Sequence, residues 1–271
     1  MVQVDPKQAV VLYEERKHKL LDLMPQNMQD LFHNVALGFL RSKADNLIDC
    51  SVVSKLTALQ TCARLKLIPE PGLGHIWFIP RYNRSIGQNE VTVQVGYKGR
   101  IELARRSGRV SSIQTYIVYK NDDWEVWEED EKTHIKVKPW WSIGADPPKP
   151  NRLDEVEFSW IRSNVEGKTE ITIAHITEIM ESKARSGGGF GWSQFPLGMS
   201  RIVPIRKAWH TWPQSPEMAH VEVVDRENEE LSDSSDKGLE SIPEGDGSLR
   251  EMPIAEEALN PEVNKEDSWD F

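Results

Sequence analysis

Basic residues gather in one short segment of this 271-residue chain, residues 93–109, where an alternating strand pattern passes into a helix pattern. Read at 100° per residue, Lys98 and Arg105 lie about 20° apart on one helical face. The glycine-rich helix start leaves N–H groups free, and the helix dipole favours an anion such as phosphate there. The segment therefore predicts a phosphate-binding face, although a solvated helix with one Glu102–Arg106 pair would show the same spacing. The basic residues of the predicted face are Lys98, Arg105, Arg106 and Arg109.

A second basic group lies around the expected turn of a β-hairpin, residues 82–89. Arg81 and Arg84 flank Tyr82 there. Cations beside a flat aromatic ring are the ingredients of sequence-neutral binding to single-stranded nucleic acid. The alternative is a solvated loop without a ligand.

A third basic group is expected on a helix at residues 197–212, where Arg206 and Lys207 oppose an apolar face. Pro204 interrupts this pattern, and it is tolerated if the helix begins near Val203, because the first turn does not need its N–H. A basic face opposite an apolar one suits phosphate contacts, but an ordinary exposed helix looks the same. The apolar face consists of Ile202, Ile205, Trp209 and Trp212.

Enzyme chemistry finds little support in the residue pattern. Asp122-Asp123 and residues 128–131 are consecutive acids, whereas carboxylates that hold Mg²⁺ must converge from spaced positions. The seven histidines form no H-x-x-H pair, and the glycine run after Ser186 lacks the Lys-Ser/Thr of a phosphate-binding loop. Sequence alone does not exclude Ser–His–Asp catalysis, but no strained nucleophile turn is visible. We expect no catalytic residue, no metal and no cofactor.

The net charge of −10 is unevenly distributed along the chain. Sixteen acidic and four basic residues follow Val224, so residues 225–271 carry −12 and the preceding residues +2. The acidic segment has too few apolar residues to offset the entropy of ordering, which predicts a disordered tail. Between Arg64 and Lys120, ten bases stand against three acids, an excess that suits a polyanionic partner. We therefore expect a core, residues 1–224, and an acidic tail, residues 225–271.

The hydrophobic periodicity predicts an α+β fold, with helices packed on one mainly antiparallel sheet and a protruding β-hairpin. The expected helices span residues 6–23, 28–41, 52–67, 97–107, 177–184 and 197–212. The expected strands span residues 75–81, 90–95, 110–119, 124–127, 134–137, 156–163 and 170–175.

Other features indicate a cytoplasmic protein. The chain has no run of 18 apolar residues and no basic-then-apolar N-terminus, so we expect neither a membrane span nor a signal peptide. Cys50 and Cys62 fit no zinc spacing, and we expect Cys62 to be a small buried hydrophobe. The pairs Trp140-Trp141 and Trp124/Trp127 are expected in the core or in subunit contacts rather than as base-stacking platforms.

Several motifs occur in a specific order: Pro71-Gly72-Leu73-Gly74, Ile79-Pro80, Gln94-Val95-Gly96-Tyr97-Lys98-Gly99, Ile101-Glu102-Leu103-Ala104-Arg105-Arg106-Ser107-Gly108 and Val118-Tyr119-Lys120-Asn121-Asp122. This order resembles the RecT family of single-strand DNA annealing proteins of phage and bacterial recombination. A weaker match follows at residues 182–185, at Trp192 and at residues 199–213. Pro204 in the last basic helix and Trp212, where the family has leucine, depart from the family pattern.

The resemblance implies an ATP-independent protein that binds single-stranded DNA and anneals complementary strands. It implies a homo-oligomer, ring or helical filament, that holds single strands and annealed duplex by the phosphate backbone, and a partner exonuclease. Two alternatives stay open: a Mg²⁺-dependent phage recombination nuclease, and a plain single-strand DNA-protecting protein. DNA contacts are expected from Arg81, Tyr82, Arg84, Lys98, Arg105, Arg106, Arg109, Arg206 and Lys207.

The last residues, 264–271, combine acids with Trp269 and Phe271. They resemble the acidic tips of bacterial single-strand binding proteins, which dock onto partners. The resemblance implies recruitment of host replication or repair proteins. The charge segregation offers a second role, in which the tail competes with DNA for the basic face of the core. An ordinary solvated tail is the third possibility.

Overall fold

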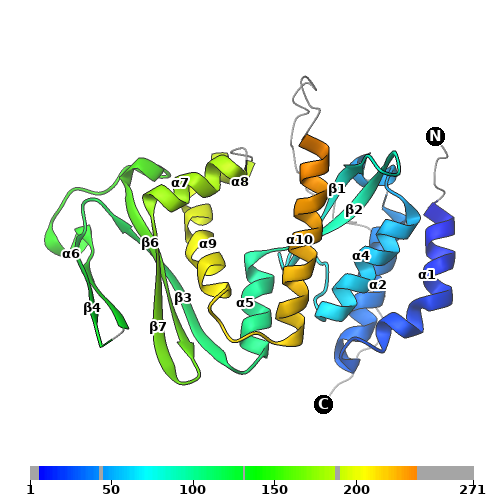
Figure 1. Ribbon diagram of the computed structural model, residues 1–271, viewed down its shortest axis with the longest axis horizontal. Helices are drawn as coiled ribbons and strands as arrows, with labels where there is room; N and C mark the ends of the chain where they lie inside the picture. Colours follow the sequence, from blue (N-terminus) through cyan, green and yellow to red (C-terminus); the bar gives the residue numbers. More distant parts are fainter. Residues whose placement is uncertain (1–5, 43–44, 131, 187–189, 237–271) are drawn as a thin grey trace, which may run out of the picture.

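The computed structural model describes residues 6–42, 45–130, 132–186 and 190–236 (Figure 1). Its helices are α1 (Pro6–Leu21), η1 (Gln26–Met28), α2 (Gln29–Arg41), α3 (Asp45–Ile48), α4 (Val52–Leu65), α5 (Tyr97–Arg106), α6 (Trp140–Ile143), η2 (Leu153–Glu155), α7 (Ile176–Arg185), α8 (Phe190–Gln194), α9 (Pro196–Trp209) and α10 (Pro216–Asp236). Its strands are β1 (Ile76–Asn83), β2 (Gln88–Val95), β3 (Val110–Tyr119), β4 (Asp123–Glu129), β5 (Lys132–Lys138), β6 (Val156–Val165) and β7 (Lys168–His175). None of these helices is long and apolar enough to cross a membrane.

The α+β class is confirmed, but the expected single sheet is three small antiparallel sheets. β1 pairs with β2, β4 pairs with β5, and the third sheet has the order β3-β6-β7. The β4–β5 hairpin contacts the third sheet through side chains instead of pairing with its edge, since Val126 and Val137 pack against the cluster around Phe158. The Trp124 ring meets the Phe158 ring edge-on at 5.0 Å. Alternation identifies strands, but it does not say which strands pair.

The main hydrophobic core extends through both sides of the molecule. On one side of Figure 1, α1, α2 and α4 lie beside the β1–β2 hairpin, and on the other α7, α8 and α9 lie beside the three-stranded sheet. α5 and α10 stand between them. The buried cluster runs from Tyr13 through Leu59 and Val93 to Trp212. Cys62 is part of it and buried as predicted, and burial raises the pKa of its thiol.

Helix α9 differs from expectation around Pro204. The helix begins at Pro196, so Pro204 lies in its interior rather than near its start. A proline there leaves the carbonyl of Ser200, four residues before it, without its helical hydrogen bond. The Ser159 hydroxyl of β6 donates to that oxygen at 2.8 Å instead. The helix tolerates the proline because the neighbouring strand supplies the missing donor.

Helix α10 extends past Val224, where we expected the folded core to end. Met218, Val221 and Val224 recur at helical spacing and are buried. The folded core therefore ends later than predicted, because the acidity of the segment concealed an amphipathic helix. The predicted disorder of the remaining tail concerns residues 237–271, which lie outside the described residues.

Candidate nucleic-acid interface

The predicted phosphate-binding face lies on α5, whose start depends on two glycines. A Cβ atom on Gly96 would stand 2.5 Å from the Gly74 carbonyl oxygen, and one on Gly99 would stand 2.4 Å from the His75 carbonyl oxygen. Only glycine allows so close an approach. Gly74 has φ +63°, the left-handed conformation that glycine adopts without strain. Residues 71–74 and the start of α5 therefore form one unit, so two of the sequence motifs are in direct contact.

Lys98 and Arg105 are exposed on this face, as are Arg106 and Arg109. Within the part of the chain that the structure describes, neither the Lys98 nor the Arg105 side chain makes an ion pair or a hydrogen bond. Burial lowers the pKa of the nearby His75, an effect to which Arg106 and Lys98 add and which Glu102 opposes. The imidazole is therefore neutral at pH 7, and the charge of this face comes from its lysine and arginine side chains.

Arg106, the next base on α5, is engaged in holding α4. Its Nη1 donates to the carbonyl oxygens of Leu65 at 3.4 Å and Lys66 at 3.1 Å, and its Nε lies 3.8 Å from Glu102. Carbonyls at a helix C-terminus lack helical partners, and a cation satisfies them. The fold thus gives Arg106 a structural role that its position in the sequence did not reveal.

Two further predicted bases are paired with carboxylates. Arg109 donates from Nε and Nη2 to Glu166 in the β6–β7 turn, at 2.8 and 2.6 Å. Lys207 on α9 donates to Glu178 at 2.8 Å and to the Ile173 carbonyl at 3.0 Å. Their charges are partly neutralised before any ligand arrives.

Arg206 is exposed on α9, as its opposition to the apolar face predicted. Packing around its guanidinium lowers the pKa of Arg206, and the neighbouring Arg100 adds to this, whereas Asp225 acts in the opposite direction. An arginine stays charged at neutral pH despite such a shift. Arg206 therefore adds a cation at the junction of α9 and α10.

The hairpin residues lie away from α5. Tyr82 and Arg84 are exposed at the turn, and the half-buried Arg81 stands opposite Glu90 in the β1–β2 register. At about 3.3 Å per strand residue, this tip is roughly 20 Å from the end of the hairpin that meets α5. Within one chain, the predicted residues therefore form separate groups on α5, the hairpin and α9 rather than one cluster.

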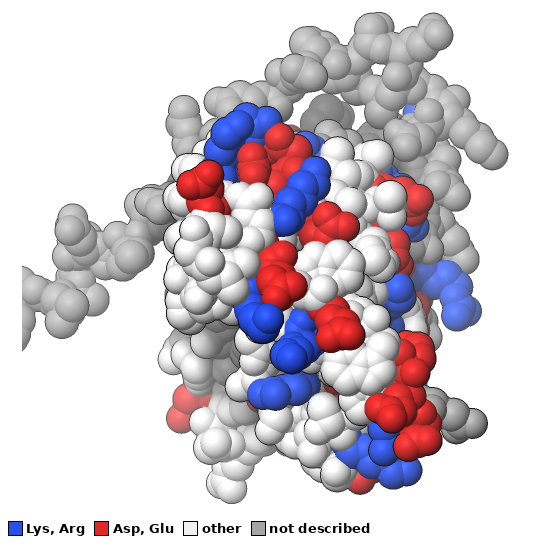
Figure 2. Space-filling model, turned by 90° about the vertical axis from the view of Figure 1, so that its left-hand side faces the viewer, with Lys and Arg blue, Asp and Glu red and all other residues white. Residues whose placement is uncertain are grey.

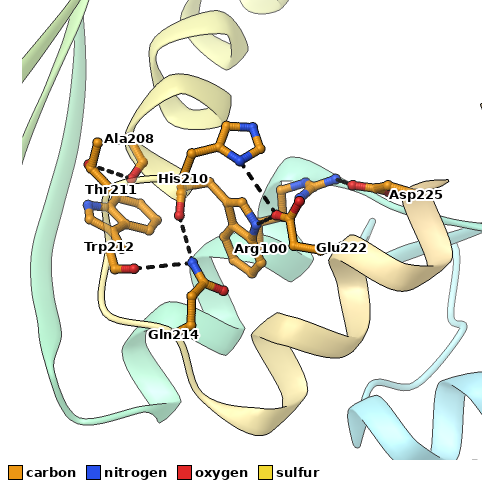
Figure 3. A network of polar contacts seen from close by, with 9 residues as sticks. Arg100, Ala208, His210, Thr211, Trp212, Gln214, Glu222 and Asp225 are labelled. Carbon is orange, nitrogen blue, oxygen red and sulfur yellow. Dashed lines mark hydrogen bonds and ion pairs between the residues drawn. The ribbon is translucent and has the colours of Figure 1, made fainter.

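Arg100, which the sequence analysis did not select, lies at the centre of a polar network between α5, α9 and α10 (Figure 3). It pairs with Asp225 at 2.5 Å, and its guanidinium carbon lies 5.0 Å from the centroid of the Trp209 ring. The Trp209 Nε1–H donates to Glu222, whose carboxylate also lies 3.7 Å from His210. These contacts hold α10 against α9 and against α5, the helix that carries Lys98 and Arg105.

A local signal could have revealed this network. Ser215 and Pro216 precede an apolar pattern and form a typical helix start, in which the Ser215 hydroxyl accepts from the Met218 N–H at 3.3 Å. Recognition of α10 would have placed Asp225 on a folded helix. Arg100 itself has no such signal, because its partner lies 125 residues away.

Strand β4, which carries acids of both runs considered for metal binding, lies on the left-hand side of Figure 1, and Figure 2 shows acidic and basic side chains interspersed on that side of the molecule. Acids of β4 stand opposite lysines of β5, and Asp123 pairs with Lys138 at 2.7 Å. Asp122 instead accepts from the backbone N–H groups of Tyr119 and Trp140, both at 2.7 Å. Across the described residues, no three His, Cys, Asp or Glu side chains converge as a metal site would require.

Comparison with known proteins defines the class. The RecT family matches residues 30–240, well over half of the chain, so this protein belongs to the RecT family. It is also similar to Protein RecT of Escherichia coli (strain K12), with 24% identity over 234 residues that cover 82% of this chain and 81% of that protein. Membership makes it a single-stranded DNA annealing protein of recombination and not an enzyme. The nuclease alternative is thereby set aside.

Proposed function

We propose that this protein holds single-stranded DNA by its phosphate backbone, with the exposed face of α5 at the centre of the contact. The observation that carries the proposal is that Lys98 and Arg105 are exposed and make no ion pair with any described residue. Such cations can replace the counterions of a nucleic acid, whereas a base already bound to a carboxylate gains less. Arg206 and Tyr82 extend the contact. A smaller contribution is expected from the bases that already have partners within the protein, which are Arg81, Arg84, Arg106, Arg109 and Lys207.

We further propose that the protein anneals DNA as a ring or helical filament, without ATP or metal. Phosphate contacts leave base edges free to find a partner. A row of subunits holds two strands at high effective concentration, which an isolated subunit does not. Assembly would also bring the separate groups on α5, α9 and the hairpin into one continuous path.

Replacing both central cations tests the DNA contact. The K98A/R105A variant should bind single-stranded DNA more weakly, and its log–log salt slope should fall by roughly 0.7 for each phosphate that the variant no longer binds. The matched control is K132A/K136A, which removes two exposed lysines from β5 at the far end of the molecule. An unchanged slope in a folded K98A/R105A variant would disprove the assignment of α5.

Annealing of two labelled complementary oligonucleotides, with and without EDTA and ATP, separates annealing from plain protection of single strands. We expect annealing under all four conditions. Competition with unlabelled duplex of equal length tests the preference for single strands, and equal competition would contradict it.

The partners proposed for this function are an exonuclease that generates single strands and, through residues 237–271, host replication or repair proteins. Acidic and aromatic residues near the end of that segment support the second proposal. Pull-down by full-length protein, compared with a variant that ends at Asp236, tests it.

A further inference from the structure

Trp77 on β1 combines exposure with a fixed position next to α5. Its side chain is 42% exposed and stands opposite the exposed Gln94 in the hairpin register. In contrast, Trp209 and Trp212 are 0% and 2% exposed, and their indole N–H groups donate to acceptors inside the protein. Within the described part of the chain, the Trp77 indole makes no hydrogen bond and stacks on no other ring.

The indole of Trp77 lies against two glycines. Its Nε1 atom is 3.1 Å from the point where a Cβ atom of Gly96 would stand, and its Cζ2 atom is 3.8 Å from the corresponding point on Gly74. The absence of side chains on both glycines makes room for the ring, and their backbone supports it. A ring that is already positioned loses little entropy when a planar ligand stacks on it.

Lys98 reaches the same place from α5. Its Cδ and Nζ atoms lie 3.4 and 3.8 Å from the Cβ point of Gly74, the point that Trp77 approaches to 3.8 Å. An exposed aromatic ring and an unpaired ammonium therefore meet at one glycine. Their spacing allows a single nucleotide to reach both, with its base on the ring and its phosphate at the ammonium.

The other exposed tryptophans among the described residues lack this combination. Trp127 stacks on His134 at 5.1 Å and donates to Glu129, while Trp124 packs against Phe158. Trp141 is 68% exposed, but it lies on α6 at the left-hand end of Figure 1, away from α5 in the middle of the molecule.

We propose that Trp77 and Lys98 form a nucleotide subsite in which the indole stacks on one unpaired base and the ammonium binds an adjacent phosphate. This inference rests on the proposed binding of single-stranded DNA and adds a contact to the bases. Every base has a π-face, so the stacking is indifferent to sequence. In a duplex the neighbouring base pairs cover those faces. The subsite therefore favours single strands, and it leaves the Watson–Crick edge of the stacked base free for annealing.

Abasic DNA separates the two contacts. We compare binding of full-length protein to a deoxythymidine oligonucleotide and to one of equal length in which most nucleotides lack a base but keep the phosphate. Wild type should prefer the normal strand by about five- to 150-fold, the range for stacking of one base. W77L, which keeps an apolar side chain, should lose this preference and retain the salt slope. W77F should retain part of the preference, and the control W141A all of it.

K98A should show the opposite result, with a reduced salt slope and an unchanged ratio of normal to abasic binding. A wild type that binds both strands equally, or a folded W77L that keeps the preference, would overturn the subsite and leave the phosphate contact intact. Failure of the full-length protein to bind either strand would instead overturn the proposed function itself.

Discussion

The two sides of α5 use basic residues in opposite ways. On the inner side, the Arg100 side chain is 10% exposed, pairs with Asp225 of α10 and lies over Trp209. On the outer side, Lys98 and Arg105 are exposed and unpaired among the described residues. A guanidinium that is buried and paired with a carboxylate attracts a phosphate only weakly, because its charge is already neutralised. A count of bases along the chain therefore overstates the cations available to DNA.

The strongest effect is expected from a change on the inner side. The D225A variant leaves the buried Arg100 without its carboxylate and next to Arg206, so we expect the free energy of unfolding to fall by about 3 kcal/mol. Urea denaturation measures this. The control D123A breaks an exposed pair with Lys138 and should leave the midpoint unchanged. Equal destabilisation of both variants would remove the distinction between inner and exposed pairs.

The outer side depends on the glycines that support it. A Cβ atom on Gly99 would stand 2.4 Å from the backbone oxygen of His75, so G99A should destabilise the protein by about 2 kcal/mol. Gly38 in α2 has open space around its Cβ position, and G38A should instead stabilise the protein by about 0.5–1 kcal/mol. Thermal unfolding compares the two, and similar shifts would contradict the close packing at α5.

Adjacent arginines on α5 provide a closer test of the two roles. R106A removes the donor to the carbonyls of Leu65 and Lys66 and should cost about 1 kcal/mol of stability. R105A should leave stability unchanged and reduce the salt slope of DNA binding by roughly 0.7. Denaturation and a salt titration on both variants check this. If the two results are exchanged, Arg106 rather than Arg105 is the DNA contact.

The weakest effect is expected from removal of the acidic tail. A variant that ends at Asp236 should bind single-stranded DNA more tightly than the full chain at about 50 mM salt, and the gap should close at higher salt as screening strengthens. A break at Val224 would be misleading, because it removes Asp225 and with it the partner of Arg100. Identical curves at low salt would leave only a recruitment role for the tail, whereas weaker binding would point to a role in folding or assembly.

Features that depend on local spacing could be predicted from the chain alone. The pattern in residues 75–81 and 90–95 predicted the hairpin, although β1 and β2 extend further into the turn than predicted. The spacing of Lys98 and Arg105 predicted that they share one helical face, and both are exposed in the structure. The two motifs that meet at the start of α5, residues 71–74 and 94–99, could also be recognised in the sequence. These features follow from φ/ψ preferences and side-chain periodicity, which act over a few residues.

Tertiary contacts establish which bases stay available. Arg100 and Arg105 lie on the same short helix, yet only contacts with α10 and α9 bury the first. Arg106 donates to carbonyls 40 and 41 residues away. The helical hydrogen bond that Pro204 removes from α9 is replaced by one from Ser159 on a neighbouring strand. The face on which a residue lies depends on its own helix. Its partner depends on which distant atoms the fold brings within hydrogen-bond distance, and the local pattern of residues does not encode that.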